Sequence, residues 1–398
     1  MQRREILQLA SGAAIALLLP TQAAWAQNTG APPAGPQVPL AANAPWRQAG
    51  QMDGDWRTKA LSYALLAPNP HNLQPWIADL RVPEQITFLY DTARALPMTD
   101  PMGRQLLIGC GCFLELLELA ANEANIAIDI SVFPAGEPSE KKLNDQPIAI
   151  VKRATRTAKA DPLFAQILRR RSTKTPYDVA RPLPERTPQE LALAMQRSAQ
   201  QGLRLGVVSA QSDANLLASL RDLTWDAWLV EFVTQRTWKE TVDLMRIGSD
   251  EVIANPDGVS LGSPFFDQLK KAGQINREGM LDTNSPGNKM AQQRYEALLK
   301  ATPAMVWISS SSNSRTAQLQ TGRAYARVAL AATAQGLCMQ PVSQALQEFP
   351  EMAASFNKLS QLLPVAQPGR LQMLARIGFG PEAEPTPRRP VQALLRQA

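Results

Sequence analysis

The stretch from Arg104 to Asn125 is apolar on all its faces when it is read as a helix, and this feature constrains the fold more than any other. A helix that is hydrophobic all round is stable only where other elements enclose it, so we expect it at the centre of the fold. Short strand-like runs on both sides can supply an enclosing sheet. They are Ile77–Val82, Ile86–Tyr90, Ile126–Phe133 and Pro147–Lys152.

A similar pattern returns in the second half of the chain. Gly322 follows Gly111 by 211 residues, and at that offset Leu119-Ala120-Ala121 aligns with Leu330-Ala331-Ala332. The repeat favours an internal duplication, although Ala-rich helices also align by chance. The second copy contains an insertion at about residues 212–301, whose polar, turn-rich sequence is typical of a lid or of a cap that faces a substrate.

Composition narrows the classes of function. The 398 residues include 41 Lys and Arg against 35 Asp and Glu without a dense basic block, which argues against a nucleic-acid partner. Three Cys and one His exclude a disulfide scaffold and leave too few ligands for a zinc site, so we expect no metal. Demanding chemistry in this chain therefore needs a bound cofactor.

The N-terminus has the pattern of an export signal. Arg3-Arg4 precedes an apolar stretch, Leu9–Leu19, and Ala24-Trp25-Ala26 then offers a signal-peptidase site with cleavage before Gln27. The paired arginines resemble a twin-arginine translocation signal, which engages export machinery for folded proteins; a general secretory signal is the alternative. We expect residues 1–26 to be removed and the mature protein to be soluble in the periplasm or otherwise outside the cytoplasm.

The mature chain is expected to divide into a linker and two halves. Residues 27–47 are rich in Pro and Ala and predict an extended, poorly ordered linker. Folded structure should begin near Trp46–Trp56. We place the first half at residues 48–155 and the second half, which carries the insertion, at residues 156–398.

Three polar or basic segments could carry chemistry. In the loop Pro68–Trp76, prolines end the preceding helix, and amide side chains suit a ring that carries carbonyls and nitrogens. The segment Arg169–Lys174 could converge on a phosphate, or it could be a solvated helix end. Arg388-Arg389, set between prolines, could point at the same ligand or belong to a disordered tail.

Together these segments resemble the FMN-dependent nitroreductase family. Pro68–Trp76 resembles the family motif Pro-Ser-x-x-Asn-x-Gln-Pro-Trp, Arg170–Lys174 resembles its Arg-Arg-Ser-x-Arg/Lys phosphate motif, and Gly378–Pro390 is similar to its closing strand and basic segment. Their inverted order resembles the tandem single-chain Acg-like subfamily. The resemblance implies an α+β nitroreductase-like fold duplicated in one chain, a monomeric pseudo-dimer of two helix-plus-antiparallel-sheet halves.

The resemblance also implies a set of FMN-binding residues, and no catalytic side chain, because the flavin carries the chemistry. The phosphate and ribityl groups would be held by Arg169 or Arg170, Arg171, Ser172, Lys174, Arg388 and Arg389. The isoalloxazine ring would be lined from the other half by Pro68, Asn69, Pro70, Asn72 and Gln74, and on its face by Pro341, Val342, Ser343 and Gln344.

The implied activity is a ping-pong, two-electron transfer through FMN to a nitroaromatic, quinone or related acceptor. NAD(P)H is one candidate reductant, but it is scarce outside the cytoplasm, so the electron donor stays open. Two alternatives remain. One is an FMN-binding storage or sequestration protein with little or no turnover, and the other is a cofactor-free structural or interaction protein.

One FMN per chain is expected. Trp56-Arg57-Thr58-Lys59 stands where a second phosphate clamp would be, and no second Asn-x-Gln-Pro-Trp follows Ser172. The weaker candidates are His71, as a flavin contact or a backbone cap; Cys110 and Cys112, as core residues; Cys338, as a redox or a buried residue; and Phe265 and Phe266, as a flavin cover or an anchor of the lid's own core.

Overall fold

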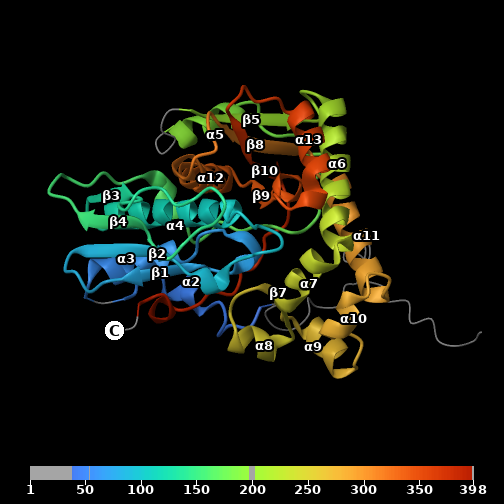
Figure 1. Cartoon of the computed structure of the whole chain (residues 1–398), viewed down its shortest axis with the longest axis horizontal. Coiled ribbons are helices and arrows are strands. Elements are labelled where there is room, and N and C mark those ends of the chain that lie inside the picture. Colours follow the sequence, from blue (N-terminus) through green and yellow to red (C-terminus); the bar gives the residue numbers. More distant parts are fainter. Residues whose placement is uncertain (1–37, 53, 197–201, 397–398) are drawn as a thin grey trace, which may run out of the picture. The chain divides into compact units, whose positions relative to one another are not determined.

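The computed structural model describes residues 38–52, 54–196 and 202–396 (Figure 1). The predicted export signal and the first part of the predicted linker lie outside these residues. The described chain folds into helices, two four-stranded antiparallel sheets and one two-stranded parallel sheet. This arrangement confirms the predicted α+β class.

The first sheet consists of β1 (Trp76–Asp79), β2 (Gln85–Tyr90), β3 (Ile128–Val132) and β4 (Pro147–Arg153). Its order is β1-β2-β4-β3, and all neighbouring strands are antiparallel. β-Branched and aromatic residues favour these strands, and alternate side chains face the core because side chains alternate along a strand.

The second sheet repeats this plan. It consists of β5 (Leu203–Ser209), β8 (Ala304–Ser310), β9 (Cys338–Pro341) and β10 (Arg370–Gly378). Its order is β5-β8-β10-β9, again with antiparallel neighbours, so each strand has a counterpart at the same place in the first sheet. The shared strand order confirms the predicted duplication into two helix-plus-antiparallel-sheet halves.

One long helix in each half connects the second strand to the third. These helices are α4 (Arg104–Glu123) and α12 (Arg315–Ala334), which begin and end 211 residues apart, as the aligned glycines predict. They pack so closely that a Cβ atom on Gly111 or Gly322 would lie only 2.0 or 1.9 Å from a backbone oxygen of the other helix. Only glycine fits at these two contacts.

The helix α4 is buried as its sequence predicts. Among the described residues it alone is long and apolar enough to cross a membrane, but most of it lies inside the fold. The shorter helix α3 (Trp56–Ala64) packs on α4, and α5 (Thr187–Gln196) packs on α12 in the same relative position (Figure 1). Each central helix thus has one shorter helix packed on it, and the two central helices pack on each other.

An insertion separates β5 from β8, close to the predicted boundaries. Its own small core contains Phe232, Trp238, Val242 and Met280. The final helix of the second half, α13 (Ala353–Leu362), packs against the first helix of the insertion. The elements of the insertion are α6 (Ala214–Val233), α7 (Gln235–Asp243), β6 (Met245–Ile247), α8 (Ser249–Ala254), β7 (Val259–Leu261), α9 (Pro264–Lys271), α10 (Arg277–Leu281) and α11 (Pro286–Lys300).

The C-terminal segment of the described chain packs on the first half, and the N-terminal segment is also ordered. The C-terminal segment leaves the second half and runs beside β1, where Ala78 donates to Leu394 at 2.8 Å and accepts from Arg396 at 2.9 Å (Figure 1). The end of the predicted linker is ordered rather than extended: α2 (Ala44–Gln48) is helical, and Trp46 is buried. The linker prediction is therefore wrong for these residues, because Trp46 finds a packing partner that its local sequence does not reveal.

Candidate functional site

The loop Pro68–Trp76 has a strained and well-braced backbone. His71, Asn72 and Gln74 have φ angles of 49°, 55° and 53°, a region that residues other than glycine adopt rarely and at an energetic cost. The side-chain oxygen of Asn69 accepts a hydrogen bond from the backbone N–H of Gln74 at 2.8 Å. Strain of this kind persists only where the surroundings impose it, and it concentrates at functional sites.

Two predicted ring-lining side chains brace this loop instead. Gln74 is fully buried; its amide nitrogen donates to the carbonyl oxygens of Asn72 and Pro256, and its amide oxygen accepts from the N–H of Arg389 at 2.8 Å. Asn72 donates to the carbonyl of Pro387 at 3.0 Å and accepts from the Arg388 guanidinium. Both amides are paired within the protein, and their place beside a ring stays a prediction.

Three arginines from the two basic segments meet around Trp46. The guanidinium carbons of Arg170, Arg171 and Arg388 lie 6.0, 4.5 and 5.6 Å from the centroid of the indole ring. Arg170 and Arg388 also donate to the carbonyl oxygen of Leu66, at 3.1 and 3.2 Å. The structure thus brings the two predicted phosphate-binding segments together at the start of the Pro68–Trp76 loop.

This arginine cluster (Arg170, Arg171 and Arg388) concentrates positive charge, which Glu382 near Arg171 offsets only in part. Within the described chain none of the three forms an ion pair, and the Nε atoms of Arg170 and Arg388 are buried without a hydrogen-bond partner. Burial, together with the neighbouring arginines, lowers the pKa of Arg388 to about 9 and that of Arg171 to about 10. Because buried like charges are costly, an anion that pairs with all three would bind strongly.

Trp46 covers the arginine cluster and is the main site residue that the sequence did not reveal. Its indole N–H donates to the carbonyl of Thr386 at 2.8 Å, and the N–H of Arg388 donates to the carbonyl of Ala42 at 2.9 Å. A cavity of about 290 Å³ is lined by residues that include Pro45, Gln48, Leu65 and Pro390. The sequence feature that could have indicated this residue is a large aromatic side chain within a Pro/Ala-rich stretch.

Lys174 and Ser172 lie on the chain that leads away from the cluster. Burial and the ammonium group of Lys174 together lower the pKa of His71 to about 4, so the imidazole is neutral at physiological pH. The backbone of Ser172 forms an isolated parallel bridge with Met339, which lies in β9. His71 contacts the insertion, where its Nε2 lies 3.1 Å from the Thr241 hydroxyl.

Two predicted arginines lie apart from the cluster. Arg169 is exposed and donates to the side chain of Gln166 at 3.3 Å. Arg389 turns towards the C-terminus, where it donates to the carbonyl of Ala393 at 2.6 Å. Of the two alternatives Arg169 and Arg170, the structure therefore favours Arg170, and Arg388 alone contributes a guanidinium from the second basic segment.

The segment Pro341–Gln344 is mostly structural. Val342 is buried in the core of the second half, and the hydroxyl of Ser343 exchanges hydrogen bonds with the backbone of Leu374 at 3.0 and 3.2 Å. Their side chains are therefore not available to a ring. Gln344 differs, because its amide oxygen accepts from the Tyr295 hydroxyl of the insertion at 3.4 Å.

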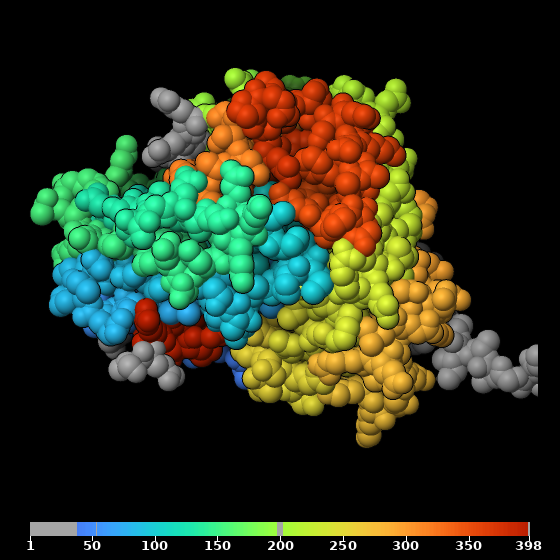
Figure 2. Space-filling view, viewed as in Figure 1, coloured from blue at the N-terminus to red at the C-terminus, as the bar shows by residue number. Residues whose placement is uncertain are grey.

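The insertion is docked on the Pro68–Trp76 loop. The N–H of Gly258 donates to the carbonyl of Asn72 at 3.2 Å. Asp257 pairs with Arg94 of the first half at 2.6 Å and with Arg246 of the insertion at 2.7 Å. The surface of the yellow insertion lies against the cyan part of the first half (Figure 2). The insertion thus has the position that a lid over this loop requires.

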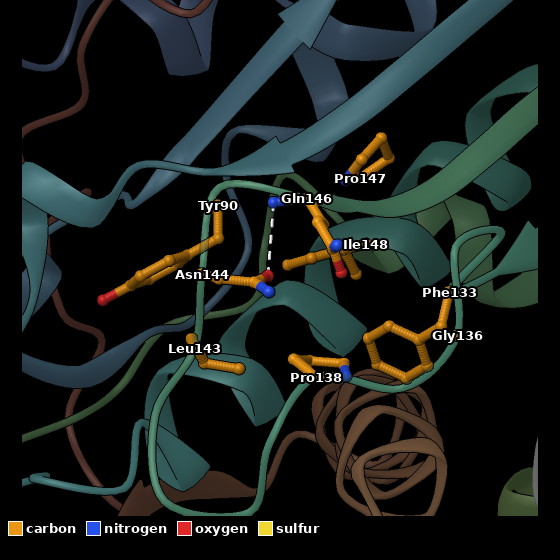
Figure 3. A pocket seen from close by; sticks show the side chains of 9 residues that line it. All are labelled: Tyr90, Phe133, Gly136, Pro138, Leu143, Asn144, Gln146, Pro147 and Ile148. Carbon is orange, nitrogen blue, oxygen red and sulfur yellow. Dashed lines mark hydrogen bonds between the residues drawn. The ribbon is translucent and has the colours of Figure 1, made fainter.

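The first half has a small pocket beside the connection between its last two strands. The connection between β3 and β4 matches the one between β9 and β10, and the pocket beside it measures about 10 Å³, room for about one water molecule (Figure 3). Phe133, Leu143 and Ile148 are among its lining side chains. Arg57 pairs with Asp55 and donates to three backbone carbonyls, so it offers no free clamp. These features support a single site per chain.

The remaining candidates have ordinary environments. Cys110 and Cys112 are buried in the core as expected, and Cys338 is half-buried. Phe265 and Phe266 pack edge to face on each other, with ring centroids 5.4 Å apart, and the core of the insertion forms without them.

No protein-family model matches the chain. Curated relatives from Mycobacterium tuberculosis (strain H37Rv) include two that are provisionally named NAD(P)H nitroreductase Rv3131 and NAD(P)H nitroreductase acg; each is 26% identical over 354 residues. These matches span 86% and 84% of this chain, and 92% and 94% of the relatives. Among solved structures, the FMN- and NADPH-dependent nitroreductase NfnB from Sphigopyxis sp. strain HMH has 16% identity and a TM-score of 0.37, over 60% of this chain and 99% of that one. Over most of its length the chain is thus similar to proteins named as nitroreductases, the family that its motifs resemble.

Proposed function

We propose that this chain is an FMN-dependent oxidoreductase of the nitroreductase type that binds one FMN per chain. The observation that carries the proposal is the arginine cluster, in which Arg170 and Arg388 are buried, no member forms an ion pair within the described chain, and which adjoins the Pro68–Trp76 loop. A phosphate group would supply the missing counter-charge and could accept hydrogen bonds from the unpartnered Nε atoms. The similarity to relatives named as nitroreductases supports the same assignment.

The described residues suit the two ends of FMN in different ways. Arg170, Arg171 and Arg388 would hold the phosphate, and Trp46 would cover it. Lys174 and the Pro68–Trp76 loop would line the ring system, which supplies two-electron redox chemistry when it is bound. The docked insertion would exclude water from the ring and limit which molecules reach it.

We further propose a ping-pong cycle with NAD(P)H as the reductant and a nitroaromatic, quinone or related compound as the acceptor. The names of the relatives support the reductant, and the family resemblance of the motifs supports the acceptor class. Anaerobic mixing of the flavin-loaded protein with NADH or NADPH tests the first half-reaction through loss of flavin absorbance. Addition of a quinone or a nitroaromatic to the reduced protein then tests the second.

FMN storage is the second candidate, and the docked insertion specifically favours it. Hydrogen bonds from Gly258 and Gln74 and the ion pair between Asp257 and Arg94 hold the insertion over the loop. A closed cover would retain FMN and slow the access of a nicotinamide. Slow flavin release together with a flavin that NAD(P)H fails to reduce would favour storage, whereas fast reduction and reoxidation would favour the enzyme.

Export and the monomeric tandem arrangement are also proposals. Arg3-Arg4, the apolar stretch after it and Ala24-Trp25-Ala26 support a twin-arginine-type signal. Cell fractionation of the wild type and of the Arg3→Lys, Arg4→Lys double variant tests the route, because only a twin-arginine substrate should be retained in the cytoplasm by this conservative change. The mass of the purified mature protein in solution tests the monomer.

A further inference from the structure

Glu231 is a buried carboxyl group that the proposed flavin site does not use. It lies on α6 with 7% of its surface exposed, and its Oε2 accepts from the amide of Gln347 at 2.9 Å. Its Oε1 lies 3.4 Å from the hydroxyl oxygen of Thr241. No ion pair of Glu231 occurs among the described residues, so only neutral donors face it. Such an environment favours the protonated carboxyl over the carboxylate.

Thr241 links this carboxyl group to His71. The hydroxyl of Thr241, on α7, lies 3.1 Å from Nε2 of His71 on the strained loop. The other ring nitrogen, Nδ1, makes no hydrogen bond to any described residue. A continuous chain of hydrogen bonds therefore runs from Gln347 through Glu231 and Thr241 to the imidazole, and it joins the insertion to the first half.

The direction of each hydrogen bond in this chain depends on Glu231. When Glu231 is ionised, the Thr241 hydroxyl donates to it, and Nε2–H of His71 then donates to the Thr241 oxygen. When Glu231 is protonated, its O–H donates to Thr241, and the Thr241 hydroxyl donates to a bare Nε2, so the ring proton sits on Nδ1. In each state the Glu231 and Thr241 oxygens and Nε2 of His71 are paired donor to acceptor, and the imidazole stays neutral in both.

The charges around Glu231, Thr241 and His71 favour a change between these two hydrogen-bond arrangements near neutral pH. Burial is the main cause that raises the pKa of Glu231 to about 7, and Glu240 on the next helix adds to it. The Glu240 carboxylate is itself held by Met98 and Thr99 of the first half. Burial and Lys174 lower the pKa of His71 to about 4, so the imidazole is not the group that takes up charge. Tyr295, whose pKa burial raises far above its usual range, remains a neutral phenol beside Glu231.

We propose that Glu231, Thr241 and His71 form a proton relay in which the protonation state of Glu231 sets the tautomer of His71. When one proton passes along the relay, Nδ1–H releases its proton, Nε2 takes the proton of Thr241, and Thr241 takes the proton of Glu231. The relay connects a buried proton store to an imidazole on the loop. Its use, delivery of a proton to an acceptor that has received two electrons, rests on the proposed function; the relay itself does not.

The single histidine of the chain makes a direct test available. The ¹⁵N chemical shifts of the two ring nitrogens of His71 distinguish the tautomers and the imidazolium. In the wild-type protein, titrated between pH 5.5 and 8.5, we expect the proton to move from Nδ1 to Nε2 with a midpoint near pH 7, the value expected for Glu231. Measurement with and without added FMN shows whether the relay needs the flavin.

Three variants complete the test. In Glu231→Gln the amide oxygen accepts from the Gln347 amide, so the NH2 group faces Thr241 as a donor and should keep the proton on Nδ1 at every pH. Thr241→Val should remove the pH dependence by breaking the chain. Glu278→Gln, an exposed position of the same insertion, should behave as wild type. An imidazolium that forms near pH 6.5 in wild type, or the same tautomer change in Glu231→Gln, would overturn the relay. A chain that binds no flavin but shows the tautomer change would overturn only the proposed function.

Discussion

Arg104 and Arg315, the first residues of α4 and α12, are both fully buried, and each donates to backbone carbonyls of the opposite half. Arg104 reaches Leu346 at 2.7 Å, in the connection between β9 and β10. Arg315 reaches Ser139 at 2.7 Å, in the matching connection between β3 and β4. This reciprocal exchange joins the two halves as two subunits would be joined in a symmetric dimer.

Replacement of Arg315 by methionine should weaken the junction of the halves. The arginine also donates to the carbonyls of Met102 and Glu140, and partly buried acceptors that lose their donor cost about 1–3 kcal/mol each. We expect the free energy of unfolding in urea to fall by about 3 kcal/mol. Arg204→Met, at an exposed position of β5, is the control. Equal stability of the two variants would contradict a joining role for Arg315.

The close approach of the central helices predicts that Gly322→Ala is poorly tolerated. A Cβ atom at this position would lie 1.9 Å from the carbonyl oxygen of Ile108, and backbone cannot move aside as a side chain can. We expect loss of more than about 3 kcal/mol of stability, or insoluble protein. Gly287→Ala has room, with its nearest neighbour at 3.8 Å, and should fold normally. Thermal unfolding that is the same for both variants would refute the contact.

The arginine cluster should contribute to FMN affinity rather than to the stability of the flavin-free protein. Arg171 is one of three like charges but also donates to the carbonyls of Leu168, Arg170 and Ala383, so the two effects of Arg171→Met should offset each other and leave the stability of the flavin-free protein nearly unchanged. The same change should weaken FMN binding about 10- to 100-fold, the loss expected for one charge-assisted hydrogen bond of about 1.5–3 kcal/mol. Flavin fluorescence titration and thermal unfolding measure the two effects. Arg169→Met, at an exposed position, should change neither, and equal affinities in both variants would remove the phosphate assignment.

Asp257 should hold the insertion in place across most of the pH range. Burial alone would raise its pKa, but hydrogen bonds from Arg94 and Arg246 outweigh burial and lower it below 3.8. A lowered pKa contributes stability above pH 3.8 that is lost as the pH falls through the folded value, so docking should persist at pH 5–7.

Asp257→Asn should therefore loosen the insertion at pH 7. We expect hydrogen–deuterium exchange of the loop Pro68–Trp76 to accelerate roughly tenfold, which corresponds to about 1.4 kcal/mol. Asp250→Asn removes an exposed partner of Lys270 elsewhere in the insertion and is the matched control. If exchange in the loop stays slow in both variants, Asp257 does not fasten the insertion.

The fold was predictable where its signal is periodic or repeated. The apolar stretch from Arg104 and the offset between Gly111 and Gly322 predicted the central helices and the duplication, because burial and close packing leave marks in the local sequence. The two basic segments were predictable because their residues follow one another in the sequence. Arg170 and Arg388 were found by residue type and motif, although their meeting depends on tertiary structure.

Other parts of the site could not be predicted, because long-range contacts decide them. Trp46 is held by the carbonyl of Thr386 and faced by three arginines from distant segments, and nothing near it in sequence indicates these contacts. Gln74 carries the expected motif, but its amide is consumed by Pro256 and Arg389. Glu231 stands among apolar residues at the end of α6, and this position was a sign in the sequence that the carboxyl group is buried.

The visible absorption spectrum of the purified mature protein, with identification and counting of the flavin released on denaturation, tests the central claim most directly. One cluster of three arginines, together with the engagement of Arg57 by Asp55 and by backbone carbonyls, predicts a flavin spectrum and one FMN per chain. Two FMN molecules per chain would contradict a single site. A colourless protein that takes up no FMN when excess FMN is added would contradict both the oxidoreductase and the storage assignments.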